Sequence, residues 1–383
     1  MSDPEVETPD PNPPEDEAEA GEQRSWMPLI AISLAMFSVV LDSTMMNVAV
    51  GAIAKDLNTT VSGVQSAISL YSLVMASLML TGGKLGDIQG AARIFMIGCG
   101  VFGVGSLLSA FSPNLPVLIL GWSVIEGIGA AMILPMAMVL IFSNYSGAQR
   151  VAAFGIWGGV QASGAALGPM LGGFLTSYLT WRLGFGMHVV IMTLALLAGR
   201  SLRQPERNRE AKLDLVGTAI STTGLMLIVL GFLLAGRYGL VTARRKLTVG
   251  DTELDLWGLS PTPILVLIGL GVLVGFAHWQ RRVQRSGGEP LLRLHILRNG
   301  GFMSSVSTDT LRQLALAGVL FIIPVFTQSV LGFSAIQSGL AVLPFSVMVF
   351  VLSMTTAGLA QRIAPKWLML GGLGAFWAGV VLL

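Results

Sequence analysis

Four ionisable side chains lie inside long apolar runs of this sequence: Asp42, Glu126, Asp309 and Arg312. An ionised side chain at the centre of a bilayer costs roughly 2.5–3.5 kcal/mol on insertion scales. A carboxyl group whose surroundings change can bind a proton on one side of a membrane and release it on the other. We therefore interpret these residues as proton-coupling candidates. The alternatives are a neutral, hydrogen-bonded Asp42 that fixes helix packing, and a structural ion pair between Asp309 and Arg312, which are three residues apart.

The composition indicates that most of the chain is not dissolved in water. Charged residues make up 11% and hydrophobic residues 53% of 383 positions, whereas soluble domains are about 25% charged. Acidic residues and prolines crowd the first 22 positions, which predicts a disordered acidic tail over residues 1–25. The single cysteine, Cys99, excludes an internal disulfide. With no phosphate-binding loop or metal constellation, we expect no cofactor, no metal and no nucleic-acid partner.

Apolar runs long enough to cross a bilayer, which takes about 20 residues, recur along the whole chain. They lie at 28–53, 62–82, 94–111, 116–142, 151–178, 183–199, 215–236, 262–279, 302–330, 336–360 and 367–383. These runs are continuous, whereas a membrane barrel shows alternating ten-residue segments. The predicted fold is an all-α polytopic membrane protein.

Lysine and arginine residues in the connecting loops predict the orientation. With the N-terminus in the cytoplasm, sixteen of these residues face the inner side and six the outer side, which agrees with the positive-inside rule. The long connection 237–261 carries most of the outward charge. We expect a multi-pass protein of the cell (inner or plasma) membrane with a cytoplasmic N-terminus.

Two pairs of segments repeat between the halves of the chain. SGVQSA (62–67) matches SAIQSG (334–339), and GKLGDIQGAARIFMIG (83–98) matches AGLAQRIAPKWLMLGG (357–372). Paired halves are typical of transporters, whose substrate site lies between the repeats. Since the last apolar run has no flanking charge, we expect the C-terminal half to be incomplete.

The segment GAALGPMLGGFL (164–175) combines small residues with a proline. Glycines four residues apart make a smooth face for close helix approach, and a proline removes one backbone hydrogen bond and kinks the helix. The positions that we expect to serve conformational change are Gly164, Gly168, Pro169, Gly172 and Gly173.

Taken together, these motifs resemble the fourteen-helix drug:proton antiporter branch of the major facilitator superfamily. The twelve-residue segment matches that branch's antiporter signature. LDSTMMNVAV (41–50) is similar to its helix-1 motif LDxTxxNxAxP, and GKLGDIQGAARIF (83–95) is similar to its loop motif GxLxDRxGRRxxL. The loop residues retained or nearby are Gly83, Asp87, Gly90 and Arg93.

The resemblance implies major-facilitator-type pseudo-symmetric bundles with a two-helix insert. The expected parts are an N-terminal six-helix bundle (26–200), a cytoplasmic linker (201–213), the insert (214–283) and a partial C-terminal bundle of about three helices (284–383). It also implies a proton-coupled, monomeric exporter of hydrophobic or cationic small molecules in a lipid bilayer, and not an enzyme. The alternatives are export of an endogenous metabolite or lipid on the same fold, and a non-transporting membrane sensor.

Departures from the family pattern concentrate near Asp42. The helix-4 motif RxxQGxG reads SVIEGIG here, with Ser123 for the arginine and Glu126 for the glutamine, and His188 stands where the family has asparagine. The sequence therefore predicts a coupled pair of carboxyl groups, Asp42 and Glu126. Candidate residues for a substrate cavity are Asn47, Thr44, Trp122, Phe154, Trp157 and Gln161, although aromatic side chains in membrane helices also serve for packing.

Overall fold

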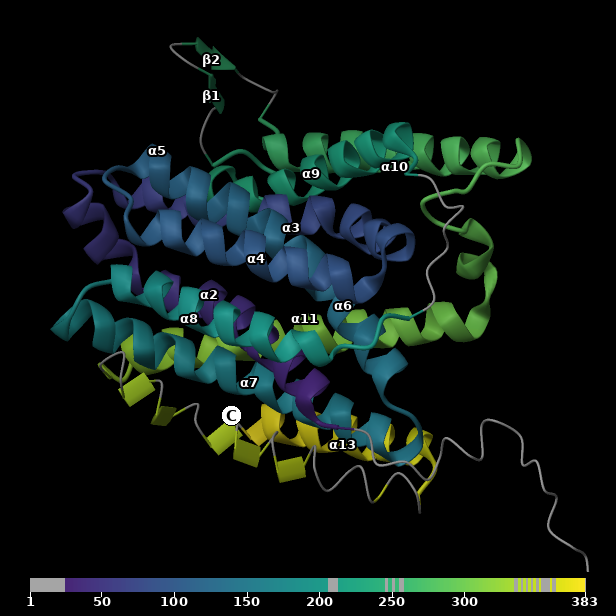
Figure 1. Cartoon of the computed structure of the whole chain (residues 1–383). Helices are drawn as coiled ribbons and strands as arrows, with labels where there is room; N and C mark the ends of the chain where they lie inside the picture. The colour runs from purple at the N-terminus through teal and green to yellow at the C-terminus, as the bar shows by residue number, and fades with distance from the viewer. Residues whose placement is uncertain are drawn as a thin grey trace, which may run out of the picture.

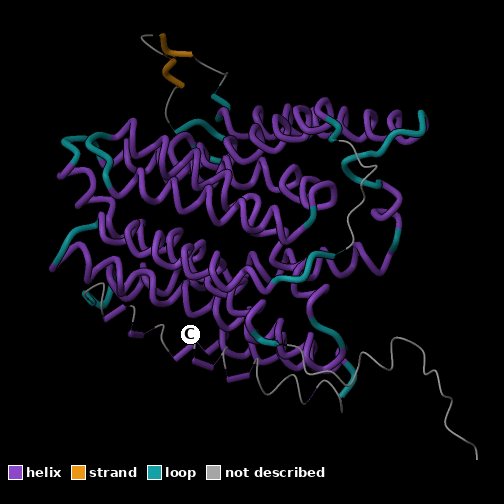
Figure 2. Tube along the Cα trace, viewed as in Figure 1, coloured by secondary structure: helices purple, strands orange, loops and turns teal. Residues whose placement is uncertain are grey.

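The computed structural model describes residues 25–205, 213–244, 247–249, 252–254, 258–333 and 363–382, with single positions between 337 and 359. The described chain is helical apart from one short hairpin (Figure 2). The expected acidic tail, except for Ser25, lies outside the described residues, as does most of the apolar run 336–360.

The helices of the first half begin and end within a few residues of the predicted apolar runs. They are α2 (Met27–Asp56), α3 (Val61–Gln89), α4 (Ala91–Ala110), α5 (Leu115–Leu118), the π-helix η1 (Ile119–Glu126), α6 (Gly127–Asn144), α7 (Gly147–Tyr178), α8 (Arg182–Ala198) and the 3₁₀ turn η2 (Gly199–Ser201). The segments α5, η1 and α6 together form the single predicted run 116–142.

The later elements include the two predicted insert helices and a hairpin. They are α9 (Leu215–Tyr238), β1 (Leu247–Val249), β2 (Thr252–Leu254), α10 (Pro261–Arg285), the 3₁₀ helix η3 (Leu294–Arg298), α11 (Gly300–Ser329) and α13 (Pro365–Leu382). The strands are antiparallel, with Leu247 opposite Leu254. They lie within the connection 237–261, where the sequence predicts only a long loop.

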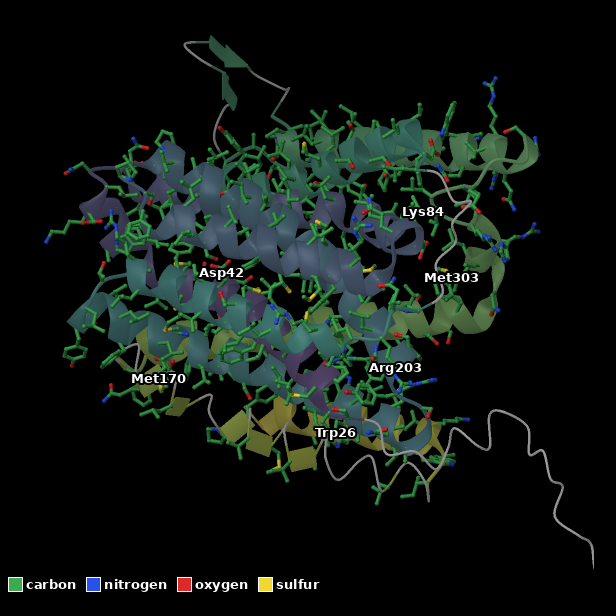
Figure 3. The ribbon with its side chains drawn as sticks, in the orientation of Figure 1. Trp26, Asp42, Lys84, Met170, Arg203 and Met303 are labelled. Carbon is green, nitrogen blue, oxygen red and sulfur yellow. The ribbon has the colours of Figure 1, made fainter. Side chains whose placement is uncertain are left out.

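The helices lie alongside one another, with α9 and α10 at one edge of the view and α7 and α13 at the opposite edge (Figure 1). Helix α2 packs on α7 and α8 and also contacts α3 and α6, while α9 packs against both α10 and α3. The insert helices are therefore attached to the first six helices through α3. Trp26, Lys84 and Arg203 lie toward the same end of the bundle (Figure 3).

Several of the described helices are long and apolar enough to cross a membrane, which confirms a multi-pass membrane protein. These are Met27–Asp56, Val61–Gln89, Ala91–Ala110, Leu115–Asn144, Arg182–Ser201, Leu215–Gly236 and Pro261–Arg285. Short polar side chains cap many of their first turns, because the first backbone N–H groups of a helix have no partner within it. Thr60 accepts a hydrogen bond from the backbone of Gly63, and Asn114 from that of Val117.

The segment predicted as a loop around 83–93 is almost entirely helical. Helix α3 continues to Gln89, and only Gly90 separates it from α4. Gly90 has φ +98° and ψ 137°, a backbone conformation that is essentially restricted to glycine. The retained glycine of the motif thus makes a one-residue corner between two membrane helices.

Candidate functional site

Asp42 lies at the middle of α2, deep inside the bundle (Figure 3). Its side chain is 0% exposed. The indole nitrogen of Trp122 on η1 donates a hydrogen bond of 2.9 Å to Asp42 Oδ2. Nε2 of His188 on α8 lies 3.7 Å from Asp42 Oδ1, and Nδ1 of the same ring lies 2.7 Å from the hydroxyl oxygen of Ser38, one turn before Asp42 on α2. Three helices therefore meet at this carboxyl group.

Glu126 is the second buried carboxyl group, at the end of η1. It is also 0% exposed, and neither carboxylate oxygen has a hydrogen-bond partner among the described residues. The Ser106 hydroxyl from α4 lies beside it, and Glu126 interacts electrostatically with Asp42. Tyr71 on α3 is buried within reach of both carboxyl groups. The structure thus brings Asp42 and Glu126 into one interior cluster without a direct hydrogen bond between them.

The π-helical stretch η1 supplies two side chains of this cluster, Trp122 and Glu126. π-helical turns inside α-helices are rare and occur frequently at functional sites. This stretch approaches α4 very closely: a Cβ atom on Gly105 would lie 2.6 Å from Glu126 Cγ and 2.7 Å from the Gly121 carbonyl oxygen. Glycine at 105 and 121 is what lets the π-helix bring Glu126 against α4.

The glycines of the predicted signature segment line the face of α7 that packs on α2. A Cβ atom on Gly164 would meet the backbone oxygen of Phe37 at 3.3 Å, and one on Gly172 would meet that of Met45 at 2.6 Å. Between them, Gly168 lies against Thr44. Helix α7 continues through Pro169, and Gly173 is buried. The signature therefore forms the seat of the helix that carries Asp42.

Two residues that the sequence suggests for a substrate cavity serve other contacts. Trp122 is 1% exposed, stacks on Tyr71 and packs edge-on against Phe185, so it belongs to the interior cluster. The Thr44 hydroxyl donates to the backbone oxygens of its own helix, including that of Val40 at 3.0 Å. Trp122 therefore does not line an open surface in this conformation, whereas Thr44 is half-buried.

The other cavity candidates are more accessible. Asn47 is exposed, and its amide donates to the Ser43 backbone oxygen at 2.6 Å. Phe154, Trp157 and Gln161 are half-buried along α7. The ring of Phe154 contacts that of Trp157 edge-on, with centroids 6.0 Å apart, and the Trp157 indole nitrogen has no hydrogen-bond partner among the described residues.

Asp309 and Arg312 form the local ion pair that their spacing allows. Arg312 donates to Asp309 Oδ1 at 2.6 Å and 3.0 Å, and both side chains are more than half exposed on α11. They take no part in the cluster around Asp42. The ion pair that the sequence offers as the alternative is therefore formed within one helix turn, and a role of the two residues in proton coupling stays a prediction.

Near the segment 83–93, two glycines that the family motif does not define, Gly82 and Gly86, also make close contacts. A Cβ atom on Gly82 would lie 2.3 Å from the Ala131 oxygen and one on Gly86 would lie 2.1 Å from Met136 Sδ, whereas Gly83 has only one neighbour, at 3.9 Å. The sequence signal for these packing residues was a second pair of glycines four apart. Asp87 and Arg93 are exposed.

Lys84 in the same segment links the first half to the chain after the insert. Its Nζ lies 3.3 Å from Glu289 Oε2, and the lysine side chain is only 9% exposed. The side chain of Gln280 on α10 accepts from the Leu292 backbone at 3.3 Å and donates to Asp214 at 2.8 Å. Residues 289–292 are thus held between α3 and α10.

Comparison with known proteins gives one consistent picture. The sequence pattern of the protein family described as the Major Facilitator Superfamily matches residues 32–383. The puromycin resistance protein pur8 of Streptomyces alboniger is 34% identical, with 94% of this chain and 68% of that protein covered. The multidrug efflux pump LfrA of Mycolicibacterium smegmatis is 30% identical, with 91% and 65% covered. The probable actinorhodin transporter of Streptomyces coelicolor is also 30% identical, with 94% and 60% covered.

This chain spans about two thirds of the length of these relatives. Among solved structures, the proton:xylose symporter XylE has a TM-score of 0.53 at 13% identity, with 87% of this chain and 68% of that chain covered. That likeness shows the fold alone.

Proposed function

This chain belongs to the major facilitator superfamily, and we propose that it works as a proton-coupled exporter of hydrophobic or cationic small molecules, in the manner of a multidrug efflux antiporter. The observation that carries the proposal is the buried carboxyl pair, Asp42 and Glu126, inside helices that cross the membrane. The relatives named for puromycin resistance and multidrug efflux favour the direction of transport and the class of cargo.

The interior cluster favours carboxyl groups that have bound a proton over carboxylates that remain ionised. Burying an isolated ionised carboxylate is very costly, whereas a carboxyl group that has bound a proton is neutral. Among the described residues, the only basic group beside Asp42 is the His188 imidazole. The carboxyl oxygens of Glu126 have no hydrogen-bond partner among the same residues. A site of this kind can exchange its proton whenever a conformational change admits water.

Helix packing around the cluster supports a moving site. In transporters of this type one bundle rocks against the other around a site near the midplane. At the α2–α7 interface, glycines of α7 lie close to both backbone and side-chain atoms of α2. A displacement of α2 against α7 would change the surroundings of Asp42 directly.

We further propose that the N-terminus is cytoplasmic. The excess of lysine and arginine in the loops on that side supports this orientation, and so does the clustering of Lys84 and Arg203 at the end of the bundle where α2 begins (Figure 3). Arg182 and its partner Asp56 then lie at the outer end.

The experiment uses inside-out vesicles from bacteria that express the protein, with puromycin and ethidium as probes. Addition of either probe should release protons from energised vesicles that contain the wild type. Asp42→Asn and Glu126→Gln should abolish this release while still supporting probe-for-probe exchange, and the exposed carboxyl variant Asp56→Asn should behave as wild type. Probe flux that is independent of pH would remove proton coupling from the proposal. Probe binding without any flux would favour a sensor.

A narrower cargo is the second candidate. One relative is named for transport of actinorhodin and another, from Amycolatopsis lactamdurans, for export of cephamycin. If the vesicles respond to neither puromycin nor ethidium but do respond to a compound of the host's own metabolism, the exporter assignment stands with an endogenous substrate.

A further inference from the structure

Two buried polar atoms face each other across the interior cluster without a hydrogen bond. Asp42 Oδ1 and His188 Nε2 each lack a hydrogen-bond partner among the described residues, and they are 3.7 Å apart with both side chains 0% exposed. Buried polar groups are almost always paired. His188 Nε2 therefore lies just beyond hydrogen-bond range of Asp42 Oδ1, and the buried Tyr71 hydroxyl, which also lacks a hydrogen bond among the described residues, is the other group beside this carboxyl.

The remaining atoms of both side chains are already held. Asp42 Oδ2 accepts from Trp122, and His188 Nδ1 is paired with the Ser38 hydroxyl at 2.7 Å. The imidazole ring is packed edge-on against Phe102 of α4 and Phe185 of its own helix. These contacts fix the ring so that only Nε2 is directed at the carboxyl group.

No stronger cation competes for this position. The titratable groups that face Asp42 from the surrounding elements are Tyr71 on α3, Glu126 on η1 and His188 on α8. Ser123 on η1 is uncharged and donates its hydroxyl to the Ala67 backbone oxygen at 2.7 Å. Among the described residues, the imidazole is the one group beside Asp42 that can become positively charged.

We propose that Asp42 and His188 together hold one coupling proton, with His188 supplying the positive partner of the Asp42 carboxylate. This inference rests on the proposed proton-coupled transport and deepens it. The loaded pair is either a carboxylic acid with a neutral imidazole or a carboxylate with an imidazolium, and both forms contain the same number of protons. Loss of that proton leaves a carboxylate and a neutral imidazole.

Ser38 makes the loaded and the unloaded forms of the pair compatible with the packing. A serine hydroxyl can donate and accept, so in both loaded forms it can accept from Nδ1–H, while Nε2 accepts from the protonated Asp42 or, as Nε2–H of the imidazolium, donates to the carboxylate. After the proton is lost, the hydroxyl can donate to the bare Nδ1 while Nε2–H donates to the carboxylate. The pair can therefore change its protonation state without a rotation of the imidazole ring between Phe102 and Phe185.

The first test observes the imidazole directly and does not need transport. The chain has three histidines, His188, His278 and His295, so ¹⁵N-histidine labelling of the full-length protein in lipid nanodiscs gives three resolvable ring systems, and His188→Asn identifies the signal of His188. We expect Asp42→Asn to move the pH at which the His188 signal titrates by at least one pH unit, and to leave the exposed His278 unchanged. An unchanged His188 titration overturns the pair.

The second test uses the vesicle assay with puromycin or ethidium. His188→Asn and, as a second substitution, His188→Gln should change the pH dependence of the maximal rate by at least one unit, with little effect on the probe concentration at half-maximal rate. The control is His278→Asn, on the exposed surface of α10. A wild-type pH profile in both folded His188 variants, alongside loss of coupling in Asp42→Asn, overturns the role of His188 and leaves the proposed function intact. Absence of proton release in the wild type overturns the proposed function, and the labelling experiment then decides the pair alone.

Discussion

Gly168 tests whether α7 really seats the helix that carries Asp42. A Cβ atom added at Gly168 would lie 1.9 Å from Thr44 Oγ1, 2.6 Å from Thr44 Cβ and 3.1 Å from the Met45 backbone nitrogen. Rotation of the Thr44 side chain could relieve the first contact but not the other two. The Gly168→Ala substitution must therefore push the two helices apart by about 1 Å to reach ordinary van der Waals separation.

The expected loss in the free energy of unfolding can be compared with a matched control substitution on the same helix. Overpacking of a close interface costs about 1–3 kcal/mol, whereas alanine is intrinsically favoured over glycine within a helix by about 1 kcal/mol. Gly158 also lies in α7, and a Cβ atom there would have no neighbour within 4 Å, so Gly158→Ala should only gain stability. Because the helix-propensity gain is common to both variants, they should differ by the overpacking cost of about 1–3 kcal/mol in the free energy of unfolding. This corresponds to roughly 1–4 °C in melting temperature for a chain of 383 residues.

The assay is thermal unfolding of purified protein in detergent, combined with the vesicle transport assay. Thr44→Gly removes both side-chain contacts, so Gly168→Ala should lose more than half of its cost when it is introduced into that background. If Gly168→Ala and Gly158→Ala melt within about 1 °C of each other, or if the Thr44→Gly background gives no relief, the close α2–α7 approach described above is wrong.

Three further substitutions report on other contacts. Gly90→Ala should lower the melting temperature by several degrees, because its backbone has φ +98° and a Cβ atom would lie on the Gln204 amide, whereas Gly100→Ala on α4, where a Cβ atom has no neighbour within 4 Å, should not. Lys84→Met should raise the rate of proteolysis in the 289–292 segment relative to wild type, and equal rates would show that the pair with Glu289 contributes nothing there. Trp122→Phe should leave Asp42 Oδ2 without its donor and lower proton-coupled transport at least tenfold with near-normal folding; unchanged transport would remove Trp122 from the cluster.

The helices were predictable from sequence because each membrane crossing needs an apolar run of fixed minimum length. Hydropathy does not, however, determine how such a helix is rotated about its axis when almost every position is apolar. For this reason the sequence indicated Asp42 and Glu126 as candidate proton-binding residues but not which neighbours they have. Trp122, which the sequence suggested for a substrate cavity, is a buried hydrogen-bond donor to Asp42. Asp309 and Arg312 were grouped with the same site, although a pair three residues apart can satisfy itself locally.

Other features have no signal in a single sequence. The π-helical stretch 119–126 lacks a residue pattern that distinguishes it from ordinary helix, and the positions of His188 and Tyr71 beside Asp42 depend on how α2, α3 and α8 are packed. Gly82 and Gly86 could have been found, since their four-residue spacing is visible, but the neighbouring family motif drew attention to Gly83.

The contacts of Glu289 and Leu292 determine where the two halves of the molecule can bend. Because α9 packs against α3 and this short segment contacts Lys84 on one side and Gln280 on the other, we expect α9 and α10 to move together with the preceding helices. Any swing of α11 relative to these helices is then confined to an elbow at residues 293–299, which is mostly the 3₁₀ turn η3. The length and stiffness of residues 293–299 would then set the amplitude of this movement, and substitutions or insertions in that segment could change it.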